Sequence, residues 1–525
     1  MIQFFARGVA RMAVLTMPAF AFTATAEAVQ HAPEAIDGEF VVELRGEVDV
    51  RVSDFGKLSR RLGVQVVDRI RSNMVLVRES NHAAKNISEK LREKTLVARV
   101  EPNYIYKISK IANDPDFAKT WGLSNSGGLD EAGTLGIAGV DFGHPDLQSQ
   151  AWTNVRELNG LPGVDDDGNG FIDDVHGYNF ADGTPDSSDD NGHGTHCSGT
   201  IGAKGGDGQG LVGVNWDVSI MALKFLKASG SGSLANAIKA IDYARLNGAK
   251  IISNSWGSAV KSDLLKTAIE DANRAGILFV VAAGNESSDN DTAPYFPSSY
   301  GVDNILSVAA INNRGLLAPF SNYGLKTVHV AAPGVKIVSS VLKNGYEAYS
   351  GTSMATPHVA GIAALLLAQF PSMNAADLKK RILESARPLA TLHGRIASGG
   401  LADAYYALSG LTPPTDPNDP ADLPNRSPYA FSSAHPYLGA TRLDRTIQVK
   451  DAKRIAVRFS HFETELGYDT VSFFDGAGRF VSAMSGKFDP GSMSPLIEGD
   501  TVTMKFASDE TIHSYGFDVD AVYSD

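Results

Sequence analysis

The stretch GTSMATPHVAGIAALLLAQF, residues 351–370, is apolar nearly all round and rich in small residues. This pattern predicts a helix that is buried on every side, so a large core must surround it. Pro357 falls in the first turn, where its missing N–H costs little. Ser353 is therefore expected at the N-terminus of a buried helix, beside backbone N–H groups and the positive end of the helix dipole. Those groups can hold a developing oxyanion, but a serine is a poor nucleophile unless a base takes its proton.

The base is expected in NGHGTHCSGT, residues 191–200, which offers His193 and His196. Glycines on both sides of His193 allow close approach of backbone and substrate. A third segment, VVAAGN, predicts a buried strand that ends in Asn285, whose side-chain amide can donate to an oxyanion. Each segment alone has an ordinary structural reading, and it is the combination that indicates catalysis.

With NSWG at residues 254–257, these segments occur in the order found in the subtilisin-like serine proteases. The chain resembles this family from about residue 113 to residue 408. The resemblance implies an endopeptidase that acts on peptide or protein substrates, with Ser353 as nucleophile, His193 as general base and Asn285 as oxyanion donor. It also implies residues that line the substrate cleft and pair with the substrate backbone: Ser255, Trp256 and Gly257.

One segment departs from the family pattern. The family's triad aspartate ends a strand, in an Asp-Thr-Gly or Asp-Ser-Gly run shortly before HPDL. Here GTLGIAGVDFGHPDL, residues 133–147, places Ile137 at that position. The segment before His144 is also shorter than in the family's usual layout, and the missing part would hold the first central strand. The resemblance therefore leaves the triad without its acid and raises the prospect of a weakened sheet.

A second register is open, in which residues 135–140 form the strand and Asp141 takes the place of the aspartate. A slide of four residues, about 13 Å, would bring Asp141 into that position. Asp130 is a weaker alternative because no apolar strand precedes it. Three readings follow: an active protease, a catalytically impaired relative that binds peptides or proteins, and a deletion variant that does not fold. Losing the aspartate leaves the serine, histidine and oxyanion donors in place.

Outward from these motifs, residues 113–410 alternate strand-like and helical runs. Apolar runs predict parallel strands at 219–225, 249–253, 277–282 and 305–310, and helices at Leu234–Leu246 and 263–275. The predicted fold class is α/β, with a mostly parallel sheet and helices on both faces.

Residues 34–110 predict a small α+β domain, with helices near 52–62 and 83–94. Its position and its VEPNYIY end resemble the family's inhibitory propeptide, so the chain's own propeptide is an expected partner, released between about 110 and 117. Residues 1–26 predict a signal peptide, from Arg7 and Arg11, an apolar run at 12–23 and an Ala24-Thr25-Ala26 cleavage site. The protein is therefore expected to be secreted, into the medium or the periplasm.

After a Pro/Asp-rich linker at 411–428, residues 429–525 alternate apolar and polar side chains, which predicts an antiparallel β-sandwich. The sandwich resembles a CUB domain without its usual cysteines. Glu465, Asp469 and Asp509 match that family's calcium ligands, and the resemblance implies a protein or glycan ligand. The alternative for the three carboxylates is a set of polar turns.

The run GVDDDGNGFIDD, residues 163–174, predicts a structural calcium site, because alternate oxygens turn inward and a glycine permits the sharp turn. The expected ligands are Asp165, Asp167, Asn169, the Phe171 carbonyl and Asp173 or Asp174. Position 12 of the loop is His176 instead of glutamate, so this is not a full EF-hand, and a solvated acidic turn is the alternative.

Composition excludes several classes. The formal net charge is −13, which disfavours nucleic acid as a partner. The chain has one cysteine, Cys197, so it holds no internal disulfide, and the thiol is expected to be a small buried residue. No apolar run after the N-terminal segment is long enough for a membrane span.

Overall fold

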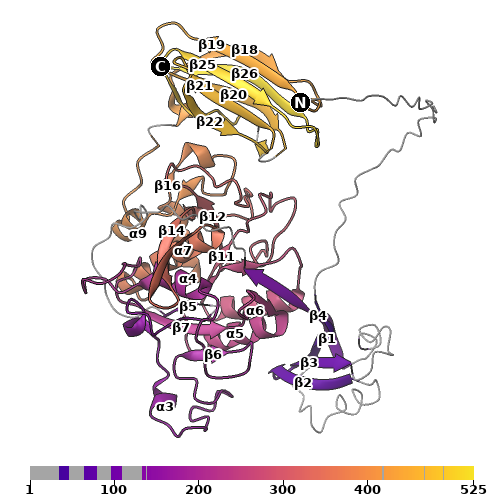
Figure 1. Cartoon of the computed structure of the whole chain (residues 1–525), viewed down its shortest axis with the longest axis vertical. Coiled ribbons are helices and arrows are strands. Elements are labelled where there is room, and N and C mark those ends of the chain that lie inside the picture. The colour runs from indigo at the N-terminus through magenta and orange to yellow at the C-terminus, as the bar shows by residue number, and fades with distance from the viewer. Residues whose placement is uncertain are drawn as a thin grey trace, which may run out of the picture. The chain divides into compact units, whose positions relative to one another are not determined.

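The computed structural model of the chain describes residues 35–45, 64–79, 91, 96–108, 133–136, 139–416, 419–465, 468–488 and 490–525 (Figure 1). All of them belong to one unit, Glu34–Asp525. The expected signal peptide, the release segment at 110–117, Asp130 and Ile137 lie outside the described residues. So do the two helices expected near 52–62 and 83–94, apart from Leu91.

The N-terminal sheet has inner strands that are apolar on both faces, whereas its edge strand at residues 64–71 carries several exposed and charged side chains. It is antiparallel with the order β4-β1-β3-β2, and its strands are β1 (Ala35–Leu44), β2 (Val64–Arg71), β3 (Met74–Glu79) and β4 (Val97–Ile108). Val41 and Leu76 belong to a core that also contains residues of the large central domain, whereas Val42 and Val75 belong to a separate cluster. The helical part of the α+β prediction stays a prediction.

The central domain is built on parallel strands. Its strands pair in the orders β6-β7-β5 and β9-β11-β12-β13, and β5 lies beside β9. They are β5 (Gly133–Gly136), β6 (Gly177–Asn179), β7 (Ser219–Lys224), β9 (Ile251–Asn254), β11 (Leu278–Ala282), β12 (Ile305–Ile311) and β13 (Val330–Pro333).

Helices cover both faces of this sheet (Figure 1). Phe279 and Val281 of β11 pack in one core with α5 (Leu234–Leu246) and α6 (Asp263–Arg274). The alternate residues Leu278 and Val280 pack in a second core with α4 (His193–Gly202) and α7 (Thr352–Gln369). The predicted α/β class with helices on both faces is therefore confirmed.

Short elements complete the central domain. They are η1 (Gln148–Gln150), α3 (Val155–Leu158), β8 (Ser231–Ser233), β10 (Trp256–Gly257), β14 (Ile337–Val341), β15 (Gly345–Tyr349), α8 (Ala375–Glu384), β16 (Arg387–Pro388), η2 (Ala390–Leu392), β17 (Gly400–Leu401), α9 (Ala404–Ser409) and η3 (Pro420–Asp422).

The first central strand, whose loss the sequence suggested, is present as β5. It pairs in parallel with β7, from Gly133 opposite Ser219 to Gly136 opposite Ala222. The strand is short and glycine-rich, and it ends directly before Ile137. The sheet thus keeps its continuity between β7 and β9 although the segment before it is shortened.

The C-terminal domain is an antiparallel β-sandwich, as predicted. One sheet has the order β18-β26-β20-β23 with β24 beside β20, and the other has the order β19-β25-β21-β22. Phe459, Phe473 and Phe506 pack between the two sheets. The strands are β18 (Asn425–Ser432), β19 (Arg442–Gln448), β20 (Arg454–Glu463), β21 (Thr470–Asp475), β22 (Phe480–Met484), β23 (Lys487–Phe488), β24 (Ile497–Glu498), β25 (Thr501–Ala507) and β26 (Gly516–Ser524). Within the described residues, no helix is both long and apolar enough to cross a membrane.

Candidate active site

Ser353 lies in the first turn of α7 and is fully buried. Its hydroxyl donates to the carbonyl of Ser255 at 3.3 Å, and the Ser255 hydroxyl donates to the carbonyl of Ser353 at 2.9 Å. Ser255 follows the end of β9. The reciprocal pair fixes the N-terminus of α7 against the C-terminal edge of the sheet, where the first backbone N–H groups of the helix can act as anion donors.

Asn285 follows β11 and is tied to the same helix. Its Oδ1 accepts the backbone N–H of Thr352 at 2.8 Å and the Thr352 hydroxyl at 2.9 Å. Because both donors hold the amide oxygen, the orientation of the side chain is fixed, and its NH₂ group is the end left to donate. The amide group therefore lies next to the first turn of α7, as an oxyanion donor requires.

His193 is the first residue of α4 and is buried. Helix α4 packs against α7, and Cys197, one turn after His193, donates its S–H to the Ser353 carbonyl at 3.4 Å. His196 turns elsewhere, stacking on Tyr349 and bonding to the carbonyl of Ile337 at 2.9 Å. Of the two histidines in the motif, His193 is thus the candidate base.

The thiol of Cys197 is a packing group at this contact. Burial raises the pKa of Cys197 to about 12, so the sulfur stays protonated at neutral pH and lacks the thiolate that a nucleophile needs. This agrees with the reading of Cys197 as a small buried residue.

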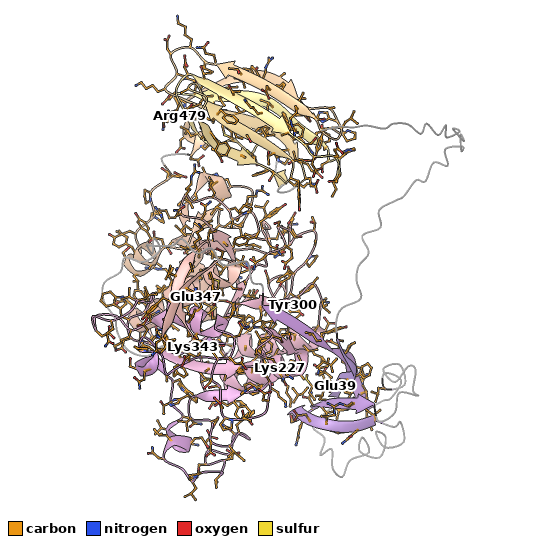
Figure 2. All side chains as sticks on the ribbon, in the orientation of Figure 1. Glu39, Lys227, Tyr300, Lys343, Glu347 and Arg479 are labelled. Atoms are coloured by element: carbon orange, nitrogen blue, oxygen red, sulfur yellow. The ribbon has the colours of Figure 1, made fainter. Side chains whose placement is uncertain are left out.

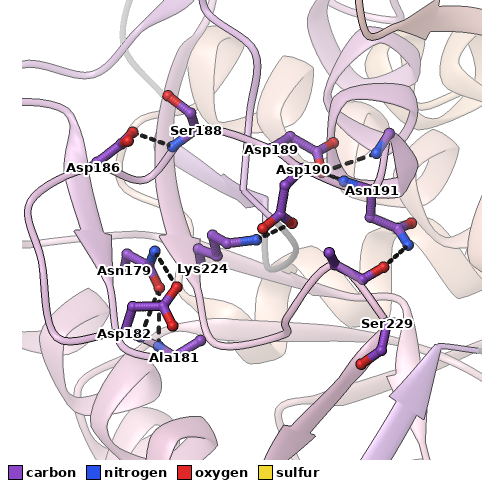
Figure 3. Close-up of polar contacts among 12 residues, drawn as sticks. Asn179, Ala181, Asp182, Asp186, Ser188, Asp189, Asp190, Asn191, Lys224 and Ser229 are labelled. Carbon is purple, nitrogen blue, oxygen red and sulfur yellow. Dashed lines mark hydrogen bonds and ion pairs between the residues drawn. The ribbon is translucent and has the colours of Figure 1, made fainter.

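Asp189, which the sequence analysis did not single out, fixes the entry into α4 (Figure 3). Its Oδ1 accepts the N–H groups of Asn191 and Gly192 at 2.8 and 3.0 Å. Its Oδ2 accepts the backbone N–H and the hydroxyl of Thr195 at 2.9 and 2.7 Å. The neighbouring Asp190 pairs with the buried Lys224 at the end of β7. An aspartate four residues before the base, at a helix start, was the available sequence signal.

The acid side of the site runs from β5 to Asp141. The strand ends at Gly136, so the residue that follows the strand is Ile137, as the first register proposes. The Asp141 backbone N–H donates to Thr195 Oγ1 at 3.0 Å, and its Oδ1 accepts the N–H of Gly143 at 3.0 Å. The Asp141 carboxylate therefore closes a turn within its own loop.

Comparisons with known proteins show the family of the chain. The model described as Subtilase family matches residues 138–423. The chain belongs to the subtilase family. A second model, the CUB domain, matches residues 425–520 of this subtilase.

Three proteins illustrate the similarity. Thermophilic serine proteinase of Bacillus sp. (strain AK1) is 32% identical over 391 residues, 71% of this chain and 88% of that protein. Subtilisin-like protease 1 of Plasmodium berghei (strain Anka) is 36% identical over 288 residues, 52% of this chain and 48% of that protein. Subtilisin-like protease 2 of Plasmodium falciparum is 41% identical over 193 residues, 36% of this chain and 14% of that protein. The chain thus spans less than half the length of these Plasmodium relatives.

In this subtilase, the N-terminal domain's own strand lies along the cleft edge. The end of β4 pairs antiparallel with β8, Ile105 opposite Ser233, and with β10, where Lys107 lies opposite Gly257 and Ile108 opposite Trp256. The cleft residues expected to pair with a substrate backbone therefore pair with residues 107–108. Trp256 is itself buried, with its ring against Phe225 at 5.0 Å.

The same strand caps two helices of the central domain. Glu101 Oε1 accepts the N–H groups of Asp263 and Leu264 at the start of α6, at 2.9 and 3.1 Å. Asn103 Oδ1 accepts the N–H of Ala235 at the start of α5, at 3.1 Å. Burial raises the pKa of Glu101 above its ordinary value, against the opposing effect of these hydrogen bonds. Figure 2 labels Glu39, whose Oε2 accepts from Asn103 at 2.8 Å, and Tyr300, whose hydroxyl binds the backbone of the α6 cap.

The acidic loop at 163–174 gathers several of its predicted ligands. Asp165 and Asp167 form a carboxylate group with Glu157, their oxygens lying within 4.8 Å of one another. Asn169 Nδ2 donates to Asp167 and Asp174, at 3.1 and 2.9 Å. Three carboxylates this close repel one another without a cation, and hard oxygen donors fit calcium. Glu157 is not among the predicted ligands, and its only sequence signal is its position six residues before the loop.

The remaining expected ligands of this loop have other contacts. Asp173 accepts the N–H of Gly163 at 2.9 Å, so of the two alternatives Asp174 is the one tied to the carboxylate group. The Phe171 N–H donates to Asn169 Oδ1 at 2.7 Å, and its ring packs on Tyr178.

The C-terminal domain gathers the carboxylates predicted there. Oxygens of Glu465, Asp469 and Asp509 lie within 4.8 Å of one another. The Tyr437 hydroxyl donates to Asp469, and the N–H of Asp509 donates to Asp469 Oδ1 at 2.8 Å. Desolvation and the two neighbouring carboxylates raise the pKa of Glu465. These oxygens also fit a calcium ion.

Proposed function

We propose that this subtilase is a secreted serine endopeptidase, made as a zymogen and stabilised by calcium. The observation that carries the proposal is the convergence at the N-terminus of α7. There Ser353 contacts Ser255 after β9 and Cys197 of α4, while its neighbour Thr352 contacts Asn285 after β11. Nucleophile, base helix and oxyanion donor come together from separate elements.

The proposed chemistry follows from these positions. Ser353 Oγ attacks the substrate carbonyl as His193 takes its proton, and the carbonyl oxygen becomes an oxyanion. The Asn285 amide and the first N–H groups of α7 stabilise that charge. His193 returns the proton to the leaving amine, and water then releases the acyl group from Ser353 by the same route.

We propose that the base works without a carboxylate at the strand end. Ile137 stands where the aspartate belongs, and Asp141, the replacement considered from sequence, accepts the N–H of Gly143 in its own loop. Without a carboxylate, the imidazole tautomer and the imidazolium lose support, so turnover is slow.

The zymogen part of the proposal is supported by β4. Its pairing with β8 and β10 covers the cleft edge, and its caps on α5 and α6 bind it to the central domain. Release of residues 34–110 would uncover the cleft. Export by the segment 1–26 would precede this step, and it rests on the sequence pattern alone.

We assign structural calcium to the two carboxylate groups. In the central domain Glu157, Asp165 and Asp167 would hold the ion, with Asn169 and Asp174 beside them. In the CUB domain Glu465, Asp469 and Asp509 would hold it. The ion's chemical contribution is to offset carboxylate repulsion and so to stabilise the loops. The CUB domain is expected to bind a protein or a glycan.

The position of Ile137 favours a second candidate function, a peptide- or protein-binding subtilase with little catalysis. One experiment separates the two. The full chain is expressed with calcium, and a fluorophosphonate label and a gel report Ser353 reactivity and release of the N-terminal domain. Ser353→Ala is expected to abolish both, while Ser385→Ala, a buried serine at the end of α8, is expected to keep both.

A folded wild-type chain that is neither labelled nor cut contradicts the endopeptidase and leaves the binding function. Labelling that persists in Ser353→Ala contradicts the assignment of the nucleophile.

A further inference from the structure

The ring of Tyr295 lies directly against Gly257 in the cleft strand β10. A Cβ placed on Gly257 would be 2.3 Å from Tyr295 Cε1 and 3.0 Å from Tyr295 Cζ. Side-chain atoms do not approach this closely, so the ring fills the space on that side of Gly257. Tyr295 is buried, with 8% of its surface exposed.

The backbone holds this ring in place from two sides. Ser258 and Phe296 form an antiparallel bridge, with N–H to carbonyl distances of 2.8 and 2.7 Å. The Tyr295 N–H donates to Ser299 Oγ at 3.1 Å, and the Ser299 N–H donates to the Tyr295 carbonyl at 2.8 Å. The backbone around the ring is therefore fixed against β10.

The pairing of β4 shows how an extended peptide lies on β10. Lys107 is opposite Gly257 and Ile108 is opposite Trp256, so the next peptide residue comes opposite Ser255. The carbonyl of Ser255 accepts the hydroxyl of Ser353, which puts that next residue at the nucleophile. We call the residue that contributes the scissile carbonyl the reacting residue.

Side chains of a strand alternate between its faces with a period of two. The reacting residue is two places along from the residue opposite Gly257, so both direct their side chains to the same face. Cross-strand partners also share a face. The reacting side chain therefore points to the side of β10 that the missing Cβ of Gly257 would occupy, where Tyr295 already lies.

We propose that Tyr295 is a specificity-determining residue that limits the reacting residue to small side chains, such as glycine, alanine and serine. That the ligand is a peptide substrate rests on the proposed endopeptidase function. The position of the ring rests on its contact with Gly257. Large side chains meet a packed ring, and overpacking of this kind is unfavourable.

The test compares two peptide substrates that differ only in the reacting residue, alanine or phenylalanine. The wild-type chain, after release of its N-terminal domain, is expected to favour alanine at least tenfold in kcat/KM. Tyr295→Gly is expected to raise kcat/KM for phenylalanine at least tenfold, and Tyr295→Phe, which keeps the ring, is expected to keep the alanine preference. Equal use of both peptides by the wild type overturns the proposal, as does an unchanged ratio in a folded Tyr295→Gly.

A binding measurement separates this proposal from the proposed function. The Ser353→Ala chain, with a foreign protease site engineered between residues 108 and 113 and cut there, is titrated with peptide acids that end in alanine or phenylalanine. Tighter binding of the alanine peptide, reversed by adding Tyr295→Gly, supports the proposal even where fluorophosphonate labelling shows that Ser353 is unreactive. Equal binding of the two peptides overturns it. Thermal unfolding of each variant checks that it is folded.

Discussion

The nucleophile side and the acid side of the site differ in how firmly the chain builds them. On the nucleophile side, hydrogen bonds hold the first turn of α7 to two different strand ends, between Ser353 and Ser255 after β9 and between Thr352 and Asn285 after β11. On the acid side, β5 is a short strand that ends directly before Ile137. The Asp141 carboxylate accepts the N–H of Gly143 in its own loop. The comparison teaches that each part of the site is positioned by its own strand or helix, so one part can lose its functional residue while the others stay in place.

The largest expected effect comes from restoring the missing carboxylate. We expect Ile137→Asp to raise kcat by about 10⁴, because loss of the triad aspartate alone lowers kcat about 3 × 10⁴-fold in subtilisin, a member of the family. Steady-state hydrolysis of one peptide substrate measures the gain. Ile137→Asn, which has the shape without the charge, is the matched control and should gain far less. A variant that folds and reacts with the fluorophosphonate label, but whose kcat does not rise, would show that position 137 lies out of reach of His193.

The next test breaks the nucleophile side. We expect Asn285→Ala to lower kcat about 10²–10³-fold, because an oxyanion donor is lost while Ser353 and His193 stay in place. The loss is best measured in the Ile137→Asp background, where the starting rate is higher. Asn247→Ala, at the C-terminal end of α5, should leave kcat unchanged. A small effect on kcat with a large effect on KM would mean that Asn285 binds substrate instead of the oxyanion.

Acid should destabilise the nucleophile side through His358, which lies inside α7. Burial lowers the pKa of His358 to about 4, whereas the unfolded side chain titrates near 6.5. Above pH 6.5 both states are neutral and the histidine has no effect. As the pH falls from 6.5 to 4, the unfolded chain takes up the proton and the folded chain does not, so stability falls by about 3 kcal/mol in all. Denaturant unfolding across this range measures the fall in the free energy of unfolding. His358→Leu should make this pH dependence weaker. The same slope in both proteins would rule out His358 as the cause.

The smallest effect concerns the link between the two sides. Thr195 accepts from Asp141 and donates to Asp189, so Asp189 joins the acid-side loop to the base helix. We expect Asp189→Ala to lower the free energy of unfolding by about 1–2 kcal/mol, as for a lost helix cap. Asp186→Ala is the exposed control. A fall in kcat without a change in Tm would instead show that Asp189 acts on His193 alone.

Local patterns predicted much of this molecule. Helix α5 has the predicted bounds Leu234–Leu246, and the parallel strands lie at the predicted runs, because periodicity records burial directly. The motifs placed Ser353 and Asn285 at one helix end. The roles of Glu157 and Tyr295 depend on how separate segments approach one another, which periodicity does not record. The strand β5 was missed because the segment before His144 is shorter than in the family's usual layout, and its pairing with β7 depends on a distant part of the chain.

The close packing of Gly139 limits where this chain can change in length. Its φ is +88°, and a Cβ there would lie 2.9 Å from backbone atoms of Ser187, Ser188 and Asp189. The backbone at Gly139 is in close contact with residues 187–189, so its position is fixed there. We therefore expect insertions or deletions earlier in the chain to leave the residues after Gly139 in place. We expect changes of length to be tolerated before Gly139 and not after it. Evolution could then shorten the segment before Gly139 while the segment after it kept its contacts with α4.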